Sequence, residues 1–350
     1  MQTVTLKDVA QRANVSIGTA SKVLSGDLRV KEENRRAVLD AVEKLGYNVN
    51  KVARSLAHKP VRIGVLLPTV FQAYYQPLLQ GIQNVTNSLS DYKFSAIYET
   101  YSSFRDDSRV IECLRRFKEE RVNGVVLGPS HVGTYSSEIA DLHKLGIPVV
   151  LVSSDLEKSG RLACIRIDAE ASGKIAADFA HAILRDMESA TVLVGSLDVT
   201  EHSRKAESFC GRAQKLGLAI EGVFETRDEM DTAYAITRKI LRERPNLRVI
   251  YVATANSLAV CRCIHDMGLS GKVRVITTDV LPELLPYIHD GTIVATLDQH
   301  LEQQGTAAVQ TLYKYLSEGV LEKEGTRIAP SLLLQSGMLE RLRDADSMQK

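Results

Sequence analysis

The sequence predicts a small all-α domain followed by an α/β body of two doubly wound parallel-sheet lobes. In residues 1–60 the apolar residues recur at helical spacing, and from Val61 onward short apolar runs alternate with helical segments. This alternation begins again near residue 190, which predicts a second lobe of similar build. We place the boundaries at 1–47 for the helical domain, 48–60 for a hinge helix and linker, 61–340 for the two-lobed body and 341–350 for a polar tail.

The charge of the chain divides at the same place. Residues 1–60 carry eleven Lys and Arg against six Asp and Glu, a net charge of +5, while the whole chain carries +1 and the remainder therefore −4. A polyanion such as a nucleic acid is attracted to the first segment and not to the body.

Three short amphipathic helices are predicted in the first domain. Thr5 can cap the first, Ser16 can cap the second, and the third ends before Gly46. Two short helices joined by a tight turn form a helix-turn-helix, whose second helix fits the DNA major groove. The outward face of that second helix carries Ile17, Gly18, Thr19, Ser21 and Lys22. An ordinary three-helix bundle with a solvated face is the alternative.

A fourth short helix is predicted over residues 50–57, capped by Asn50 and closed before Pro60. A helix of this length is not stable alone in water. One interpretation is a hinge that orders on DNA; the other is a linker helix in which Val52 and Leu56 simply pack together.

The body has the alternation of a parallel sheet covered by helices. Its apolar runs are 61–67, 94–99, 123–128 and 147–153 in the first lobe, and 190–195, 219–224, 248–254 and 272–278 in the second. Two such lobes predict a cleft at the carboxyl ends of their strands. Neither first strand is followed by GxGxxG or GxxxxGK[ST], and no GxSxG is present, so nucleotide-dependent and serine-nucleophile enzymes are disfavoured.

The N-terminal motifs LKDVA at 6–10, VS at 15–16, TASKVL at 19–24 and LGY at 45–47 resemble the head of the lactose/galactose repressor family. The resemblance implies that Ile17, Gly18 and Lys22 face base edges, and that Thr5, Ser16, Thr19 and Ser21 touch the DNA backbone. It also implies a hinge helix in the minor groove, with Leu56 as a wedge between base steps. The DNA-contacting hinge residues would be Asn50, Ala53, Arg54 and Leu56.

The stretches IDAEASGKIAADF at 167–179 and GTIVATLDQHLEQQGTAAV at 291–309 resemble the body shared by these repressors and periplasmic sugar receptors. The implied ligand is a sugar, whose hydroxyls donate to carboxylates and accept from guanidinium or amide groups. The expected effector-binding residues are Phe71, Tyr74, Ser153, Asp168, Arg204, Asn256, Asp279 and Gln299, with Tyr75 as an alternative aromatic partner in the loop after the first strand. Each has a plainer interpretation: Asp168 and Asp279 can cap helices, and Arg204 can be a surface charge.

The sequence lacks features that secreted, membrane-spanning and metal-binding proteins carry. The N-terminus lacks the basic and apolar regions of a secretory signal, and no apolar run approaches the roughly 20 residues of a membrane span. The five cysteines are scattered, which predicts reduced thiols, and no His/Cys cluster has metal-ligand spacing. We expect a cytoplasmic protein without metal or other cofactor.

The resulting hypothesis is a sequence-specific DNA-binding transcriptional regulator, a repressor, controlled by a sugar or sugar derivative bound between the lobes and free of catalytic residues. Because the C-terminal segment lacks leucine heptads, we expect a homodimer on a pseudopalindromic operator. The alternatives are a sugar-binding receptor whose N-terminal head is only an interaction module, and a sugar-modifying enzyme with a regulatory domain.

Overall fold

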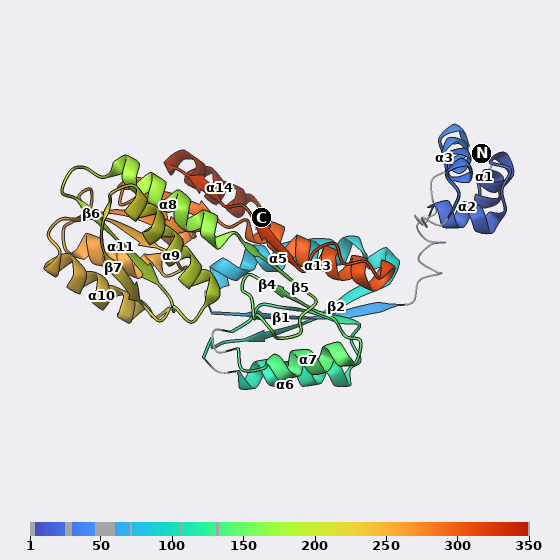
Figure 1. Ribbon diagram of the computed structural model, residues 1–350, viewed down its shortest axis with the longest axis horizontal. Helices are drawn as coiled ribbons and strands as arrows, with labels where there is room; N and C mark the ends of the chain where they lie inside the picture. The colour runs from blue at the N-terminus through green and yellow to red at the C-terminus, as the bar shows by residue number, and fades with distance from the viewer. Residues whose placement is uncertain are drawn as a thin grey trace. The chain divides into compact units, whose positions relative to one another are not determined.

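The computed structural model describes residues 4–24, 30–45, 60–70, 72–105, 107–130 and 133–348, with side chains to residue 343. The chain divides into an N-terminal unit, which holds the first three helices, and a large body (Figure 1). Within the described segments, no helix combines the length and apolar character needed to cross a membrane.

The N-terminal unit contains α1 (Leu6–Arg12), α2 (Ile17–Leu24) and α3 (Glu32–Leu45). Thr5 and Asp8 form a reciprocal capping box at the start of α1, and the amide of Thr19 donates to Ser16 Oγ at 3.1 Å. Between α1 and α2 the chain turns at Asn14, which has a φ of 51°. The three helices share one small core, made of Val9, Ala10, Ala13, Ala20, Val23, Val38 and Ala41. Both predicted caps are confirmed.

The body begins with lobe 1, a six-stranded parallel sheet whose strands lie in the order β11-β5-β4-β3-β1-β2. The strands are β1 (Val61–Pro68), β2 (Phe94–Tyr101), β3 (Gly124–Leu127), β4 (Val149–Val152), β5 (Ala163–Ile167) and β11 (Gly325–Ile328). Helices α5 (Gln72–Ser88) and α13 (Leu301–Glu318) cover one face, and α6 (Ser108–Glu119) and α7 (Ser136–Lys144) cover the other (Figure 1). Because both faces are covered, β3, β4 and β5 are buried along their entire length. A short 3-10 helix, η1 (Ser90–Tyr92), precedes β2.

Lobe 2 repeats this build with the strand order β12-β10-β9-β8-β6-β7. Its strands are β6 (Ser189–Val194), β7 (Ala219–Glu225), β8 (Leu247–Val252), β9 (Arg274–Thr278), β10 (Ile293–Asp298) and the antiparallel edge strand β12 (Ser331–Leu333). Its helices are α8 (Ala169–Ile183), α9 (Thr200–Lys215), α10 (Met230–Glu243), α11 (Ser257–Asp266), the 3-10 helix η2 (Pro282–Leu284), α12 (Leu285–His289) and α14 (Gln335–Met348). The predicted fold class, an all-α unit followed by two doubly wound lobes, is confirmed.

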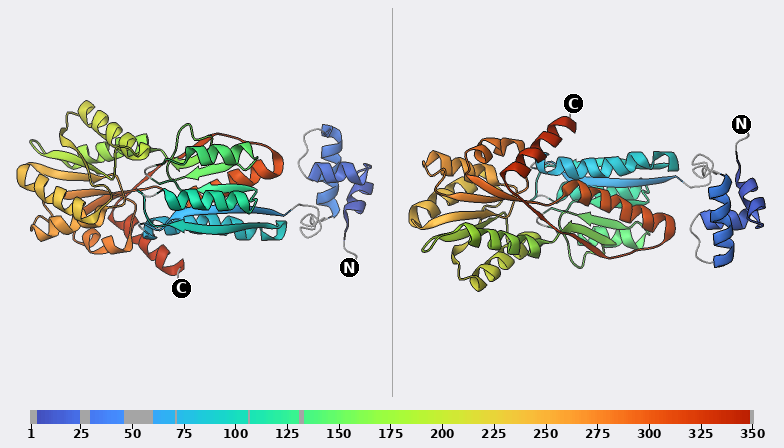
Figure 2. Two further views of the ribbon diagram at one scale, coloured as in Figure 1. Left: turned by 90° about the horizontal axis from the view of Figure 1, so that it is seen from below. Right: turned by 90° about the horizontal axis from the view of Figure 1, so that it is seen from above.

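The lobes are not two successive halves of the chain. The chain leaves lobe 1 after β5, returns to it after β10 to form α13 and β11, and crosses again before β12. Three crossing segments therefore join the lobes, at Asp168, at residues 299–300 and at residues 329–330 (Figure 2). The alternation of strands and helices did not predict this return, because it carries no information about which sheet a strand joins.

Two elements depart from the expected boundaries. Helix α5 starts at Gln72, so Tyr74 and Tyr75 lie in its first turn rather than in a loop. Helix α14 runs from residue 335 through residue 348, across the segment expected to be a polar tail from 341, and it packs against lobe 2 (Figure 2). Met338 and Leu342 are buried in the lobe 2 core, which gives this otherwise polar segment an apolar face.

Helices α5 and α13 approach each other closely at two glycines. A Cβ atom placed on Gly305 would lie 2.1 Å from the carbonyl oxygen of Leu78, and one on Gly81 would lie 2.1 Å from that of Glu302. Backbone atoms cannot move aside as a flexible side chain can, so this contact requires glycine on both helices.

We predict that Gly305→Ala lowers the free energy of unfolding by about 1–3 kcal/mol, because the added methyl group overlaps the backbone of α5. Gly211→Ala in α9 is the matched control: no atom lies within 4 Å of the place that its Cβ would occupy, so the alanine should stabilise the helix by about 0.5–1 kcal/mol. Urea denaturation of the full chain measures both. Equal effects of the two substitutions would contradict the close packing.

Candidate functional site

The exposed face of α2 is the first candidate site. Ile17, Gly18, Ser21 and Lys22 are exposed, while Thr19 is half-buried and its hydroxyl lies 2.9 Å from Ser16 Oγ. Ile17 is 51% exposed although it is a large apolar residue. An exposed apolar side chain beside hydroxyls and one ammonium suits the edges of base pairs, including the methyl group of thymine. Thr5 and Ser16 are exposed and occupy the caps of α1 and α2.

Five predicted contact residues lie outside the described part of the chain. These are Asn50, Ala53, Arg54 and Leu56 of the expected hinge, and Phe71 of the expected effector site.

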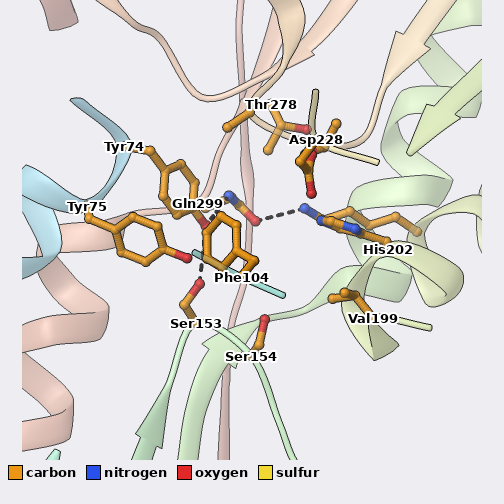
Figure 3. A pocket seen from close by; sticks show the side chains of 13 residues that line it. Tyr74, Tyr75, Phe104, Ser153, Ser154, Val199, His202, Asp228, Thr278 and Gln299 are labelled. Atoms are coloured by element: carbon orange, nitrogen blue, oxygen red, sulfur yellow. Dashed lines mark hydrogen bonds between the residues drawn. The ribbon is translucent and has the colours of Figure 1, made fainter. Parts of the chain in front are cut away.

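The second candidate site is a cavity between the two lobes of the body (Figure 3). It lies at the carboxyl ends of the strands, where open α/β sheets bind ligands. Lobe 1 contributes Tyr74, Tyr75, Phe104, Ser153 and Ser154, and lobe 2 with the second crossing segment contributes Val199, His202, Lys205, Asp228, Thr254, Ala255, Thr278 and Gln299.

Gln299, on the crossing segment after β10, links both lobes through its amide group. Its Nε2 donates to Asp279 Oδ2 at 2.6 Å and to Tyr74 Oη at 3.1 Å, and its Oε1 accepts from Lys205 Nζ at 2.9 Å. The backbone amide of Gln299 also donates to Asp279 Oδ1, at 2.8 Å. The hydroxyl groups of Tyr74 and Ser153 lie 3.3 Å apart, which extends the network into lobe 1. With both donors and the acceptor engaged, the orientation of the Gln299 amide is fixed.

Burial shifts the pKa of both charged residues that bond to Gln299. Burial lowers the pKa of Lys205 to about 8, although the nearby charges of Asp279, Glu201 and Asp228 oppose the shift. Burial, followed by the charge on Asp298, raises the pKa of Asp279 to about 6, against the opposing effect of its bonds to Gln299. Titratable groups with such shifts in a cleft are typical of ligand-binding sites.

Charged pairs also connect the lobes around the cavity. Arg166 of β5 donates to Glu201 of α9 at 3.0 Å, and both side chains are buried. Burial raises the pKa of Glu201, while Arg166 opposes the shift. At the exposed rim, Arg204 pairs with Glu157 at 2.8 Å and Arg105 pairs with Glu229 at 3.2 Å. One buried pair and two rim pairs therefore connect the lobes around the cavity.

Family models match both units of the chain. The model for bacterial regulatory proteins of the lacI family matches residues 5–50, and a periplasmic binding protein domain matches residues 63–319. The chain belongs to the lacI family. It is a transcriptional regulator with a DNA-binding helix-turn-helix domain.

Similar proteins agree with this membership. The catabolite control protein A of Priestia megaterium is 27% identical over 334 residues, which cover 91% of this chain and 94% of that protein. The protein of the same name from Staphylococcus xylosus is 33% identical over 208 residues, 59% of this chain and 58% of that protein.

Solved structures share the fold of the body. GanP, a glucose-galactose binding protein from Geobacillus stearothermophilus, has a TM-score of 0.72 at 19% identity and covers 79% of this chain and 99% of its own. A protein from Bacteroides fragilis described as a putative LacI transcriptional regulator has a TM-score of 0.69 at 20% identity, covering 81% of this chain and 99% of its own.

In this lacI-family regulator the cleft gathers some of the predicted effector residues. Tyr74, Ser153 and Gln299 line the cavity, and Asp279 is held behind them by Gln299. Asp279 also lines a second small cavity on the other side of Tyr74, beside α14.

Three other predicted effector residues do not line the cavity. Asp168 caps α8 by accepting from the amide of Ala171 at 3.0 Å, as its plainer interpretation expected. Arg204 points to Glu157 at the rim. Asn256 is buried at the start of α11, one residue beyond the lining residue Ala255, and its Nδ2 has no hydrogen-bond partner among the described residues.

The sequence interpretation missed the polar residues that lobe 2 brings to the cavity. Val199, His202 and Lys205 recur every three residues at the start of α9, a spacing that places them on one face of a helix just after β6. Asp228 follows β7 in the same way. Applying the strand-end rule to every strand of lobe 2 would have marked the segments after β6 and β7, but it does not single out Lys205 within α9. Across the described residues, no group of His, Cys, Asp and Glu is arranged to hold a metal ion.

We predict that Lys205→Met changes how stability depends on pH. The folded-state pKa of Lys205, about 8, lies below the unfolded value of 10.5, so the buried ammonium destabilises the fold most below pH 8, and this cost declines as the pH rises toward 10.5. Between pH 7 and pH 9.5 the free energy of unfolding of the wild type should therefore rise by about 1–2 kcal/mol relative to that of the variant.

Chemical denaturation across this pH range provides the measurement. Lys215→Met, at an exposed position near the end of the same helix, is the control and should show no such change. Parallel stability curves for wild type and Lys205→Met would contradict a buried ammonium in the cleft.

Proposed function

We propose that this chain is a repressor that binds a pseudopalindromic operator as a homodimer and responds to a polyhydroxylated effector in the interlobe cavity. The observation that carries the proposal is the cavity itself. It lies between the lobes, one crossing segment lines it through Gln299, and its lining is rich in hydroxyl and charged groups. A ligand bound there contacts both lobes at once and changes the angle between them.

The DNA-binding role belongs to α2 and the expected hinge. The exposure of Ile17, Gly18 and Lys22 supports base contacts, and the cap positions of Thr5 and Ser16 support contacts to phosphates. Thr19 and Ser21 add hydroxyls on the same helix. The hinge residues Asn50, Ala53, Arg54 and Leu56 complete the proposed DNA-contacting set.

The effector-binding role belongs to Tyr74, Ser153 and Gln299, with Lys205, His202 and Asp228 added from the cavity lining. The lining includes both hydrogen-bond donors and acceptors, as binding to adjacent hydroxyls requires. Asp279 orients Gln299 rather than meeting the ligand directly. Phe71, Asp168, Arg204 and Asn256, expected from the sequence, remain outer positions in this proposal.

Ligand binding and DNA binding are coupled in this proposal because lobe 1 follows the hinge directly in the chain. If ligand changes the lobe angle, it changes the separation of two hinges in a dimer, and the affinities for ligand and DNA are then reciprocally linked. A differential affinity of a few kcal/mol between the two lobe arrangements is enough for a switch.

The homodimer is the arrangement that a two-fold operator requires. Lobe 1 carries a groove between α5 and the edge strand β2, lined by Val65, Leu79 and the 39%-exposed Tyr98 among other residues. Apolar lining beside an unpaired edge strand supports a protein contact there. We further propose that the protein acts in the cytoplasm and catalyses no reaction, in contrast to the sugar-receptor and sugar-modifying alternatives.

We predict that full-length protein shifts a small set of genomic fragments in electrophoresis, and that one or more members of a panel of sugars and sugar phosphates changes this shift. The DNA-binding unit supports the first response, and the cavity supports the second. Recovery of each sugar unchanged, by chromatography, separates a regulator from a sugar-modifying enzyme. The proposal fails if no fragment is preferred over random competitor DNA with any compound of the panel.

We predict that Lys22→Ala weakens binding to the preferred sequence by about 1–3 kcal/mol and relaxes the base preference at one position, because an exposed ammonium on α2 reads a base edge. Lys44→Ala, which removes an exposed ammonium on α3 rather than on α2, is the control and should keep the preference. Binding to a library of single-base operator variants measures both. An equal loss on all sequences would mean that Lys22 contacts only phosphate.

A further inference from the structure

Asp228 brings a carboxylate to the cavity at a fixed place. It lies between β7 and α10, and both it and Arg227 adopt left-handed backbone conformations, with φ of 55° and 57°. Thr254 Oγ1 donates to Asp228 Oδ1 at 2.5 Å. On the same loop, Glu229 pairs with Arg105 of lobe 1, so the loop is anchored from both lobes. Non-glycine residues with positive φ are costly and gather at functional sites.

Three carboxylates act on Lys205 from around the cavity, those of Asp279, Glu201 and Asp228. Of the described lining residues, Lys205 alone is a Lys or Arg, and Asp228 alone is an Asp or Glu. A ligand ammonium placed beside Asp228 would therefore meet a favourable charge, while a phosphate or carboxylate placed there would meet an unfavourable one.

Aromatic rings form the wall that faces Asp228. Tyr74 and Tyr75 lie on the side of the cavity opposite Asp228 and His202 (Figure 3). The rings of Tyr74 and Tyr75 meet edge to face at 4.8 Å, and the ring of Phe104 lies 6.2 Å from that of Tyr75. Burial raises the pKa of Tyr75 well above its usual range, and the charges of Tyr74 and Asp228 add to the shift. Aromatic faces together with a carboxylate form the kind of site that binds ammonium groups.

We propose that the effector is an amino sugar, with its ammonium group between Asp228 and the aromatic wall of Tyr75 and Phe104, and with its hydroxyls toward Lys205 and Gln299. Asp228 is then the residue that selects an amine over an uncharged or anionic substituent. The inference rests on the proposed effector role of the cavity and adds the chemical class of the ligand.

The variant Asp228→Asn tests this assignment with little disturbance of the fold. Asparagine has the same shape, and it tolerates the left-handed conformation better than most residues. It keeps an acceptor for Thr254 but loses the negative charge. Asp231→Asn, at an exposed position in the first turn of α10, is the matched control.

The experiment is titration calorimetry of the full chain at pH 7 with glucosamine, galactosamine and mannosamine, each compared with its N-acetyl derivative and its parent sugar. We expect at least one amine to bind about tenfold more tightly than its N-acetyl derivative and its parent. Asp228→Asn should reduce this ratio to about twofold or less, while Asp231→Asn should keep it. Thermal unfolding of each variant checks that it is folded.

If no amino sugar binds more tightly than its N-acetyl derivative, or if the ratio survives in folded Asp228→Asn, the inference is overturned. Because the experiment measures direct binding, a failure of this inference can be distinguished from a failure of the proposed regulatory function. A protein that selects its operator and responds to an uncharged sugar keeps the proposed function and loses this inference. Selective amine binding without any operator preference would support this inference and contradict the proposed regulatory function.

Discussion

The body depends on one side-chain amide, that of Gln299, which joins the two lobes where the chain crosses between them. Lys205 and Asp279 belong to lobe 2 and Tyr74 belongs to lobe 1, and all three bond to this single group. A buried amide is stable only when its donors and acceptor are satisfied, and here all of them are. The lobe angle and the orientation of this amide are therefore set together.

The polar side chains that a ligand would meet in the cavity are already hydrogen-bonded to one another. A ligand must replace some of the bonds among Lys205, Gln299 and Tyr74, so its net affinity depends on how well its hydroxyls restore them. The buried pair of Arg166 and Glu201 acts differently, because breaking it would leave a charge uncompensated. The first network can be rearranged by a ligand, while the second resists separation of the lobes.

The fold class followed from the sequence because it rests on periodic apolar patterns, and these survive in the structure from β1 to β9. The interlobe route of α13 and β11 did not follow, since pairing between β5 and β11 depends on residues some 160 positions apart. Tyr74, Ser153 and Gln299, which line the cavity, could be proposed from the sequence because they follow strands or lie in a family-like stretch. Lys205 and Asp228 were missed because a single charged residue in a helix or loop looks like a solvated one until the opposite lobe covers it. Arg204, in contrast, was expected in the cavity, but the buried side chain belongs to Lys205, the next residue along α9.

The route of the chain also has a consequence for biosynthesis. The ribosome releases the three N-terminal helices first, and their core is complete by residue 45. The sheet of lobe 1, in contrast, lacks its outer strand until residues 325–328 have been translated. During most of elongation the nascent polypeptide therefore contains every residue of the three-helix core but not of the lobe 1 sheet, and a premature stop codon late in the message would leave that sheet without its outer strand.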